Sequence, residues 1–92
     1  MKQVIGRKIY DTNTSTLVGQ YNNGMPCDNV HHLYTVLYLS PNGQYFKHLQ
    51  YWEDKLISHL RIVDDSDAFA FLESINDCMA MEKYFDDYLE KG

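Results

Sequence analysis

The sequence predicts an α+β fold, in which a small, twisted antiparallel sheet of four to five strands carries one or two C-terminal helices on one face. Two observations support this prediction. Strand-like segments bounded by turn residues fill residues 1–63, and helical periodicity begins after residue 64. The chain has 92 residues, of which 45% are hydrophobic and 23% charged, values typical of one folded domain with a small core. We therefore expect a single domain over residues 1–92, with a β-sheet part (1–63) and an acidic helical part (64–92).

The first strands are expected at residues 3–10 (QVIGRKIY) and 16–22 (TLVGQYN). Residues 11–15 (DTNTS) join them, and Asp and Asn side chains in such a segment favour a turn. Residues 22–26 (NNGMP) form a second break in the pattern, which predicts a loop before the next strand.

The strongest local signal is a hairpin in which residues 32–40 (HLYTVLYLS) and 44–52 (QYFKHLQYW) flank Pro41-Asn42-Gly43. Proline fixes φ at the first turn position and Gly43 can adopt positive φ, so we predict a type I turn with a glycine bulge. This turn sets three cross-strand pairs: Tyr38–Phe46, Leu37–Lys47 and Leu33–Tyr51. A two-residue Asn-Gly turn would shift every pair by one and exchange the faces.

Both faces of this hairpin are apolar. Leu37 and Leu39 point to one side, whereas Val36 and Tyr38 point to the other. Because burying each such side chain is worth roughly 1.5–3 kcal/mol, we expect both faces to be covered. One face should meet the helices, and the other should meet a bent-over strand, a second copy of the chain or a target. Residues 57–63 (ISHLRIV) are expected to form a further strand.

Asp64-Asp65-Ser66-Asp67 is a helix-capping sequence, and two apolar stripes follow it. The first stripe comprises Ala68, Phe71, Leu72, Ile75, Cys78 and Met79. The second comprises Met81, Tyr84, Phe85, Tyr88 and Leu89, and it lies about 120° away at ~100° per residue. We therefore predict two helices that break near Asn76-Asp77, where either residue can cap the second helix. The alternative is one long helix whose far end packs on a dimer mate.

The charge is strongly asymmetric. The net charge is −5, but residues 53–92 carry eleven acidic and four basic residues, whereas residues 1–52 carry two acidic and four basic residues. This balance argues against direct nucleic-acid binding, which needs clustered Lys and Arg.

In a continuous helix, Glu82, Asp86 and Glu90 would form one row of carboxylates at i, i+4 and i+8, widened by Asp87. We predict that this row binds a basic partner, with Tyr84 and Tyr88 supplying stacking or apolar contacts. The alternative is a solvated helix face.

Catalytic, metal and cofactor sites are not expected. The possible metal ligands are Cys27, Asp28, His31 and His32, with His48 and His59 as further candidates. Zinc usually requires tighter spacing, and adjacent His residues on a strand point to opposite sides.

Glu53 and Asp54 are neighbours, but adjacency does not make a glycosidase pair, and the sequence has no P-loop, dinucleotide fingerprint or nucleophile elbow. With two cysteines, no signal-like start and no long apolar run, the sequence favours a cytoplasmic protein that does not enter a membrane.

Several short motifs resemble those of a known group of proteins. They are Tyr10-Asp11-Thr12-Asn13-Thr14, Asn23-Gly24, and Leu37-Tyr38 with Gly43, Tyr45-Phe46 and His48. Together they resemble a family of small proteins of bacterial mobile elements and phages, which share a Tyr-Asp-Thr-x-Thr segment and a Leu-Tyr…Gly-x-Tyr-Phe-x-His hairpin. In size, charge and genomic company, that family is similar to anti-CRISPR and other anti-defence inhibitors. The resemblance covers about residues 8–48. After His48 the family continues with a Gly-rich stretch, whereas Leu49-Gln50-Tyr51-Trp52 extends the strand here.

The resemblance implies a double hairpin and a mobile-element origin, and it leaves the target open. Combined with the acidic tail, it favours a non-enzymatic inhibitor of a bacterial defence complex, possessing no cofactor and working in the cytoplasm of a bacterial host. Such an anti-CRISPR protein would act as a DNA mimic, placing carboxylates where a Cas effector binds phosphates. The alternative is a homodimeric structural or regulatory module of a mobile element, with the second sheet face or the Met81/Tyr84/Tyr88 stripe as its symmetric interface.

Overall fold

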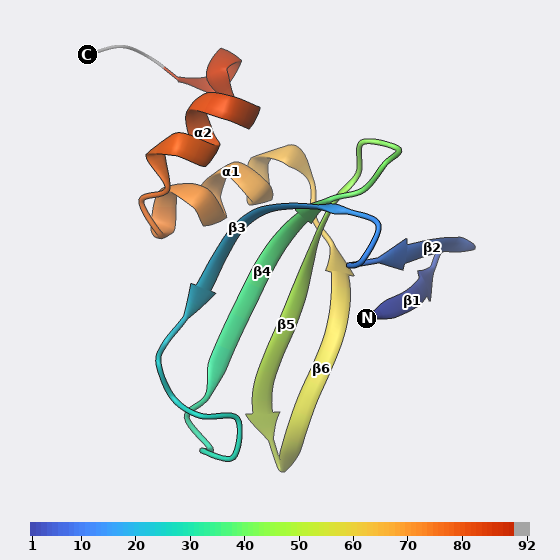
Figure 1. The fold of residues 1–92 in the computed structure, drawn as a ribbon, viewed down its shortest axis with the longest axis vertical. Coiled ribbons are helices and arrows are strands. Elements are labelled where there is room, and N and C mark those ends of the chain that lie inside the picture. Colours follow the sequence, from blue (N-terminus) through green and yellow to red (C-terminus); the bar gives the residue numbers. More distant parts are fainter. Residues whose placement is uncertain (90–92) are drawn as a thin grey trace.

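The computed structural model describes residues 1–89 and confirms the predicted α+β class. In this part of the chain, six strands form two antiparallel sheets, and two helices and a 3-10 helix follow them. The larger sheet has the order β3-β4-β5-β6, and the helices lie at one end of it (Figure 1). Its strands are β3 (Thr16–Asn22), β4 (Leu33–Leu39), β5 (Tyr45–Glu53) and β6 (Lys55–Ile62).

The β4–β5 hairpin has the turn and register that the sequence predicts. Gly43 has φ 87° and donates its backbone N–H to the Ser40 carbonyl at 2.9 Å. The three expected pairs Tyr38–Phe46, Leu37–Lys47 and Leu33–Tyr51 are all present. The further strand expected near residues 57–63 is also confirmed as β6, which begins earlier and pairs with β5.

The prediction of one strand over residues 3–10 is wrong. This segment is a separate two-stranded hairpin of β1 (Lys2–Ile5) and β2 (Lys8–Asp11). Gly6 and Arg7 both have positive φ, 57° and 71°, as a tight type I′ turn requires. The Asx turn after β2 does form, because Asp11 Oδ1 accepts from the Asn13 N–H at 2.9 Å. However, it leads β3 into the other sheet, so β2 and β3 do not make the expected hairpin.

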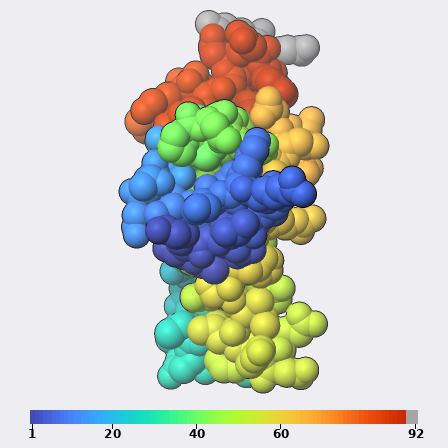
Figure 2. All heavy atoms as spheres, turned by 90° about the vertical axis from the view of Figure 1, so that its right-hand side faces the viewer, coloured from blue at the N-terminus to red at the C-terminus, as the bar shows by residue number. Residues whose placement is uncertain are grey.

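The β1–β2 hairpin packs on the second face of the larger sheet, so the chain itself supplies a cover for the apolar face that the helices leave free. Tyr10 is buried against Phe46 and Leu60, with its ring centroid 5.3 Å from that of Phe46. The Gln3 amide accepts from the Leu60 N–H at 2.9 Å and donates to the Leu60 carbonyl at 3.4 Å. Figure 2 shows these N-terminal residues, in blue, between the helices above and the lower ends of the strands below. The chain thus covers this face and occupies part of the β6 edge with its own residues.

The opposite face, which we call the helix-side face, packs against α1 (Asp65–Ser74) and α2 (Cys78–Tyr84). The predicted two helices are confirmed and the single long helix is wrong. Asn76 takes φ 54°, which a helix cannot continue, and Asp77 caps α2 by accepting from the Ala80 N–H at 3.1 Å. At the other end of α1, Asp64 accepts from the Asp67 N–H at 2.8 Å.

The two apolar stripes are only partly buried as predicted. Ala68 and Leu72 of the first stripe and Met81 and Phe85 of the second are buried in the core beneath the helices. Cys78 and Met79 are exposed, Met79 by 84%, so their assignment to the first stripe is wrong. The break at Asn76 restarts the helix in a new orientation, which turns these two side chains outward.

Gly19 on β3 lets α1 approach the sheet. A Cβ atom at this position would lie 2.7 Å from Leu72 Cδ2 and 3.3 Å from Asp77 Oδ2. Leu72 is fully buried and therefore has no free space to move into. The absence of a side chain at Gly19 is what allows Leu72 to reach the sheet.

His48 lies between Tyr34 and Ser58, on the face of the larger sheet that carries the β1–β2 hairpin. Its Nε2 lies 2.8 Å from Ser58 Oγ, and its ring meets the Tyr34 ring edge-on with centroids 6.0 Å apart. Burial lowers the pKa of His48 below its usual value, and the N-terminal ammonium group and His59 lower it further. The folded protein therefore favours the neutral imidazole.

We predict that Gly19→Ala lowers the free energy of unfolding by about 1–3 kcal/mol, because the added methyl group forces Leu72 from its place. Urea denaturation followed by circular dichroism measures the effect. The exposed neighbour Gln20 provides the control, since Gln20→Ala should change stability by less than about 0.5 kcal/mol. Equal midpoints for the two variants would contradict close packing at Gly19.

We predict that stability falls as the pH is lowered from about 7 to 5, and that His48→Gln weakens this dependence. The unfolded chain protonates His48 near its ordinary pKa of 6.5, whereas the folded chain resists protonation until lower pH. Stability is thus full above pH 6.5 and is lost as the pH falls through the lowered pKa. Urea titrations of both proteins at several pH values provide the measurement. Parallel curves for the two proteins would show that His48 does not contribute.

Candidate protein-binding surface

Phe85 is the centre of an aromatic cluster that fixes the end of the described chain. Its side chain is only 3% exposed, and its ring stacks on Tyr45 with centroids 5.2 Å apart. The Phe69 ring lies 5.6 Å away and the Tyr88 ring 5.3 Å away, both edge-on. The rings of Phe69 and Tyr88 also pack together, with their centroids 5.5 Å apart. We call Tyr45, Phe69, Phe85 and Tyr88 the aromatic cluster, which joins β5, α1 and the chain after α2.

The predicted row of carboxylates along one helix does not form. Helix α2 ends at Tyr84, Phe85 leaves the helical conformation with φ −133° and ψ 33°, and Asp86–Tyr88 form the short 3-10 helix η1. The physical reason is the burial of Phe85 in the aromatic cluster, which a continued helix would have to release. Glu82 and Asp86 therefore belong to different elements.

The residues proposed from the sequence are mostly at the surface. Glu82 is exposed on α2, and Asp86 and Asp87 are exposed on η1. Tyr88 is 49% exposed, and Tyr84 is half-buried against the helical core, with Lys83 Nζ 5.4 Å from its ring centroid. Glu90 lies outside the described residues.

The structure adds two acidic residues that sequence reasoning assigned only to helix capping. Asp64 and Asp65, at the start of α1, line a shallow hollow of about 470 Å³ together with Gln44, Ser66 and Tyr88. Asp86 and Asp87 immediately precede Tyr88 in the chain. We call Asp64, Asp65, Asp86, Asp87 and Tyr88 the acidic end. Nothing local in the sequence signals this grouping, because it depends on the contact between Phe69 on α1 and Tyr88 on η1.

The electrostatics of the acidic end favour a cationic partner. Residues 64–89 contain eight carboxylates and one basic residue, Lys83. The pKa of the nearby Tyr45 is raised, first by burial and then by the negative charge of Asp65. A concentration of exposed carboxylates attracts Lys and Arg side chains over a distance of about one Debye length, which is ~8–10 Å in physiological salt.

The histidines and cysteines that could suggest metal binding do not converge. Within residues 1–89, no group of three or more His, Cys, Asp or Glu side chains is arranged to hold a metal ion. Buried His32 has its ring nitrogens 2.7 Å from the Met25 carbonyl and 2.8 Å from Gln50 Oε1, so both are already engaged. His31, Cys27 and Asp28 are exposed on the same loop.

Comparison of the chain with protein-family models, curated proteins and solved structures gave no match. Among residues 1–89, no helix combines the length and the apolar character that membrane crossing requires. The interpretation of the acidic end therefore depends on its own geometry and charge.

We predict that Phe85→Leu lowers the free energy of unfolding by about 1–3 kcal/mol, because leucine cannot reproduce the three ring contacts. The Tyr88 ring should also lose its fixed environment, which aromatic NMR resonances report directly. Met79→Leu is the matched control on the exposed face of α2, and it should leave both readouts unchanged. An unaltered Tyr88 spectrum in Phe85→Leu would mean that the cluster does not fix η1.

Proposed function

We propose that the chain is a non-enzymatic protein inhibitor of a bacterial defence complex, of the anti-CRISPR type, which binds a basic nucleic-acid-binding surface. The observation that carries this proposal is the acidic end, where the half-exposed Tyr88 lines a hollow with Asp64 and Asp65 and follows the exposed Asp86 and Asp87 on η1. The partner is a protein with a Lys/Arg-rich surface, and the chain itself does not contact nucleic acid.

Carboxylates on a fixed backbone suit this role because they can replace phosphates as acceptors for Lys and Arg donors. Asp86 and Asp87 lie on η1, which the aromatic cluster holds against α1. Their positions are therefore set before binding, which lowers the entropic cost of association. Tyr88 adds a ring with a polar tip, a side chain enriched where protein interfaces are strongest.

The choice of a defence complex derives from the sequence resemblance to small mobile-element proteins. The motifs that carry it fall on β2, the following Asx turn, the β3–β4 connection and the β4–β5 hairpin. These elements form the scaffold and not the acidic end, so they support the origin of the protein and leave the identity of the target to experiment. A mobile-element inhibitor of this kind acts in the cytoplasm of its bacterial host.

A homodimeric module is the second candidate, and one observation favours it. Below α1, no element of the described residues 1–89 covers the helix-side face, and Tyr21 and Leu33 there are each 40% exposed. Pairing two copies through this face would bury these apolar side chains. A monomeric mass by light scattering at high protein concentration would exclude this candidate without affecting the first.

We predict that the double variant Asp86→Lys/Asp87→Lys loses inhibition while keeping its fold. Reversing two charges at the contact should weaken binding by about ten- to a hundredfold, equivalent to about 1–3 kcal/mol. The measurement is the plaquing efficiency of CRISPR-targeted phages on a panel of bacteria with active CRISPR loci of different types, each expressing one variant. Thermal melts test whether the fold is retained.

Asp28→Lys/Glu53→Lys is the matched control, because it makes the same change in net charge at two exposed positions at the other end of the sheet. This variant should inhibit like the unmodified chain. If the two double variants inhibit equally, the acidic end is not the contact surface. If the unmodified chain protects no phage in the panel, the anti-CRISPR function itself is contradicted.

A further inference from the structure

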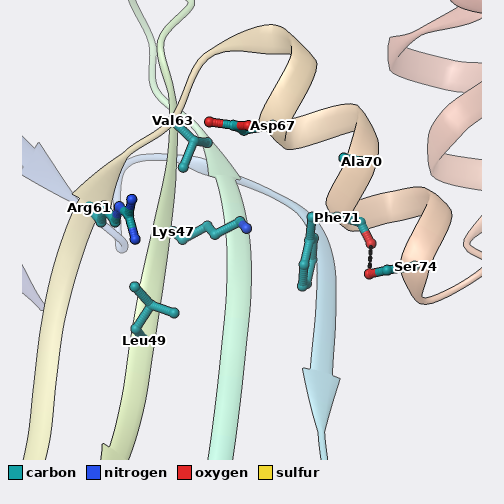
Figure 3. Close-up of a pocket in the computed structure, with 8 residues that line it drawn as sticks. All are labelled: Lys47, Leu49, Arg61, Val63, Asp67, Ala70, Phe71 and Ser74. Atoms are coloured by element: carbon teal, nitrogen blue, oxygen red, sulfur yellow. Dashed lines mark hydrogen bonds between the residues drawn. The ribbon is translucent and has the colours of Figure 1, made fainter.

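A cleft between α1 and the sheet is separate from the acidic end and has the opposite charge character. It has a volume of about 410 Å³, within the range of small-molecule sites. Figure 3 shows that β5 and β6 form one wall and α1 forms the other. The lining side chains are Lys47, Leu49, Arg61, Val63, Asp67, Ala70, Phe71 and Ser74.

Two cationic residues line this cleft from neighbouring strands. Lys47 on β5 and Arg61 on β6 are direct cross-strand partners and therefore share the helix-side face. Like charges directly opposite each other destabilise a sheet, so the pair is unfavourable for folding alone. Burial lowers the pKa of Lys47, Arg61 lowers it further, and Asp67 opposes both effects. One carboxylate thus faces two cations, which leaves the cleft with an excess positive charge.

Apolar side chains also line the cleft. The Lys47 ammonium lies over the Phe71 ring, with Nζ 4.7 Å from the ring centroid. Leu49, Val63 and Ala70 supply the other apolar surface, and the Ser74 hydroxyl already donates to the Phe71 carbonyl at 2.6 Å. The site therefore combines a positive group at one point with walls suited to a hydrocarbon or aromatic body.

We propose that this cleft binds an organic anion with an apolar body, whose carboxylate pairs with Lys47 and Arg61 while its apolar part lies against Phe71 and Leu49. Such an anion would relieve the repulsion between the two cations. It would also occupy the apolar space under α1. Either a free small acid or the C-terminal carboxylate of a protein tail has this chemistry.

The test uses the full chain and 4-phenylbutyrate as the probe, followed by two-dimensional ¹H–¹⁵N NMR. We expect saturable shifts at the amides of Lys47, Leu49 and Phe71, and binding at least about tenfold weaker for the neutral analogue 4-phenylbutyramide. N-acetyl-glycyl-phenylalanine and its C-terminal amide form a second pair of probes. Tighter binding of the peptide acid than of phenylbutyrate assigns the site to a protein tail, and the reverse order assigns it to a small acid.

Lys47→Met should weaken phenylbutyrate binding by about tenfold, because it keeps the aliphatic stem and removes the charge. Arg61→Gln, at an exposed position, tests the second cation without disturbing the core. Lys83→Met is the matched control, since Lys83 also lies over an aromatic ring, that of Tyr84, but outside the cleft. Absence of saturable shifts with both acids, equal binding of acids and amides, or an equal loss in Lys83→Met would overturn the proposal.

Discussion

The register of the β4–β5 hairpin determines which side chains each layer of the molecule receives. The pairing of Leu37 with Lys47 places both on the helix-side face, and the pairing of Tyr38 with Phe46 places both toward the β1–β2 hairpin. A slip of one residue would place Phe46 and Leu37 on the same face, so that either Phe46 moves under the helices or Leu37 moves away from them. The turn at Gly43 therefore determines the core beneath the helices and the smaller core of Tyr10, Phe46 and Leu60. The aromatic cluster and the position of Lys47 depend on the same turn.

The helices cover only one end of the helix-side face, and this arrangement separates two surfaces of different chemistry. Because Gly19 allows Leu72 to reach the sheet, α1 crosses it near the β3–β4 side. The space that remains toward β5 and β6 is the cleft with Lys47 and Arg61. The acidic end lies where η1 returns to the start of α1. A single helix placement thus explains a positive cleft and a negative end in one small chain.

Local chemistry in the sequence predicts those parts of the fold that local chemistry decides. Pro41 and Gly43 are sufficient to predict the turn and its register, and the change of apolar stripe predicts the break at Asn76, because one straight helix cannot bury both stripes. No local pattern in the sequence predicts the turn at Gly6-Arg7, because arginine seldom adopts positive φ. The contact of Tyr88 with Phe69 and the position of α1 over the paired Lys47 and Arg61 arise from tertiary packing, so no local pattern reveals either site.

The end of α2 shows how a buried side chain can decide the shape of a binding surface. Helical periodicity favours continuation through Asp86, since Met81, Phe85 and Tyr88 share one apolar stripe and no proline intervenes. Phe85 instead unwinds the chain to stack on Tyr45, and the backbone of η1 closes with a bond from the Tyr88 N–H to the Phe85 carbonyl at 2.9 Å. Burial of Phe85 supplies the stabilisation, and its consequence is that Asp86, Asp87 and Tyr88 leave the line of α2, with Tyr88 reaching the hollow that Asp65 lines.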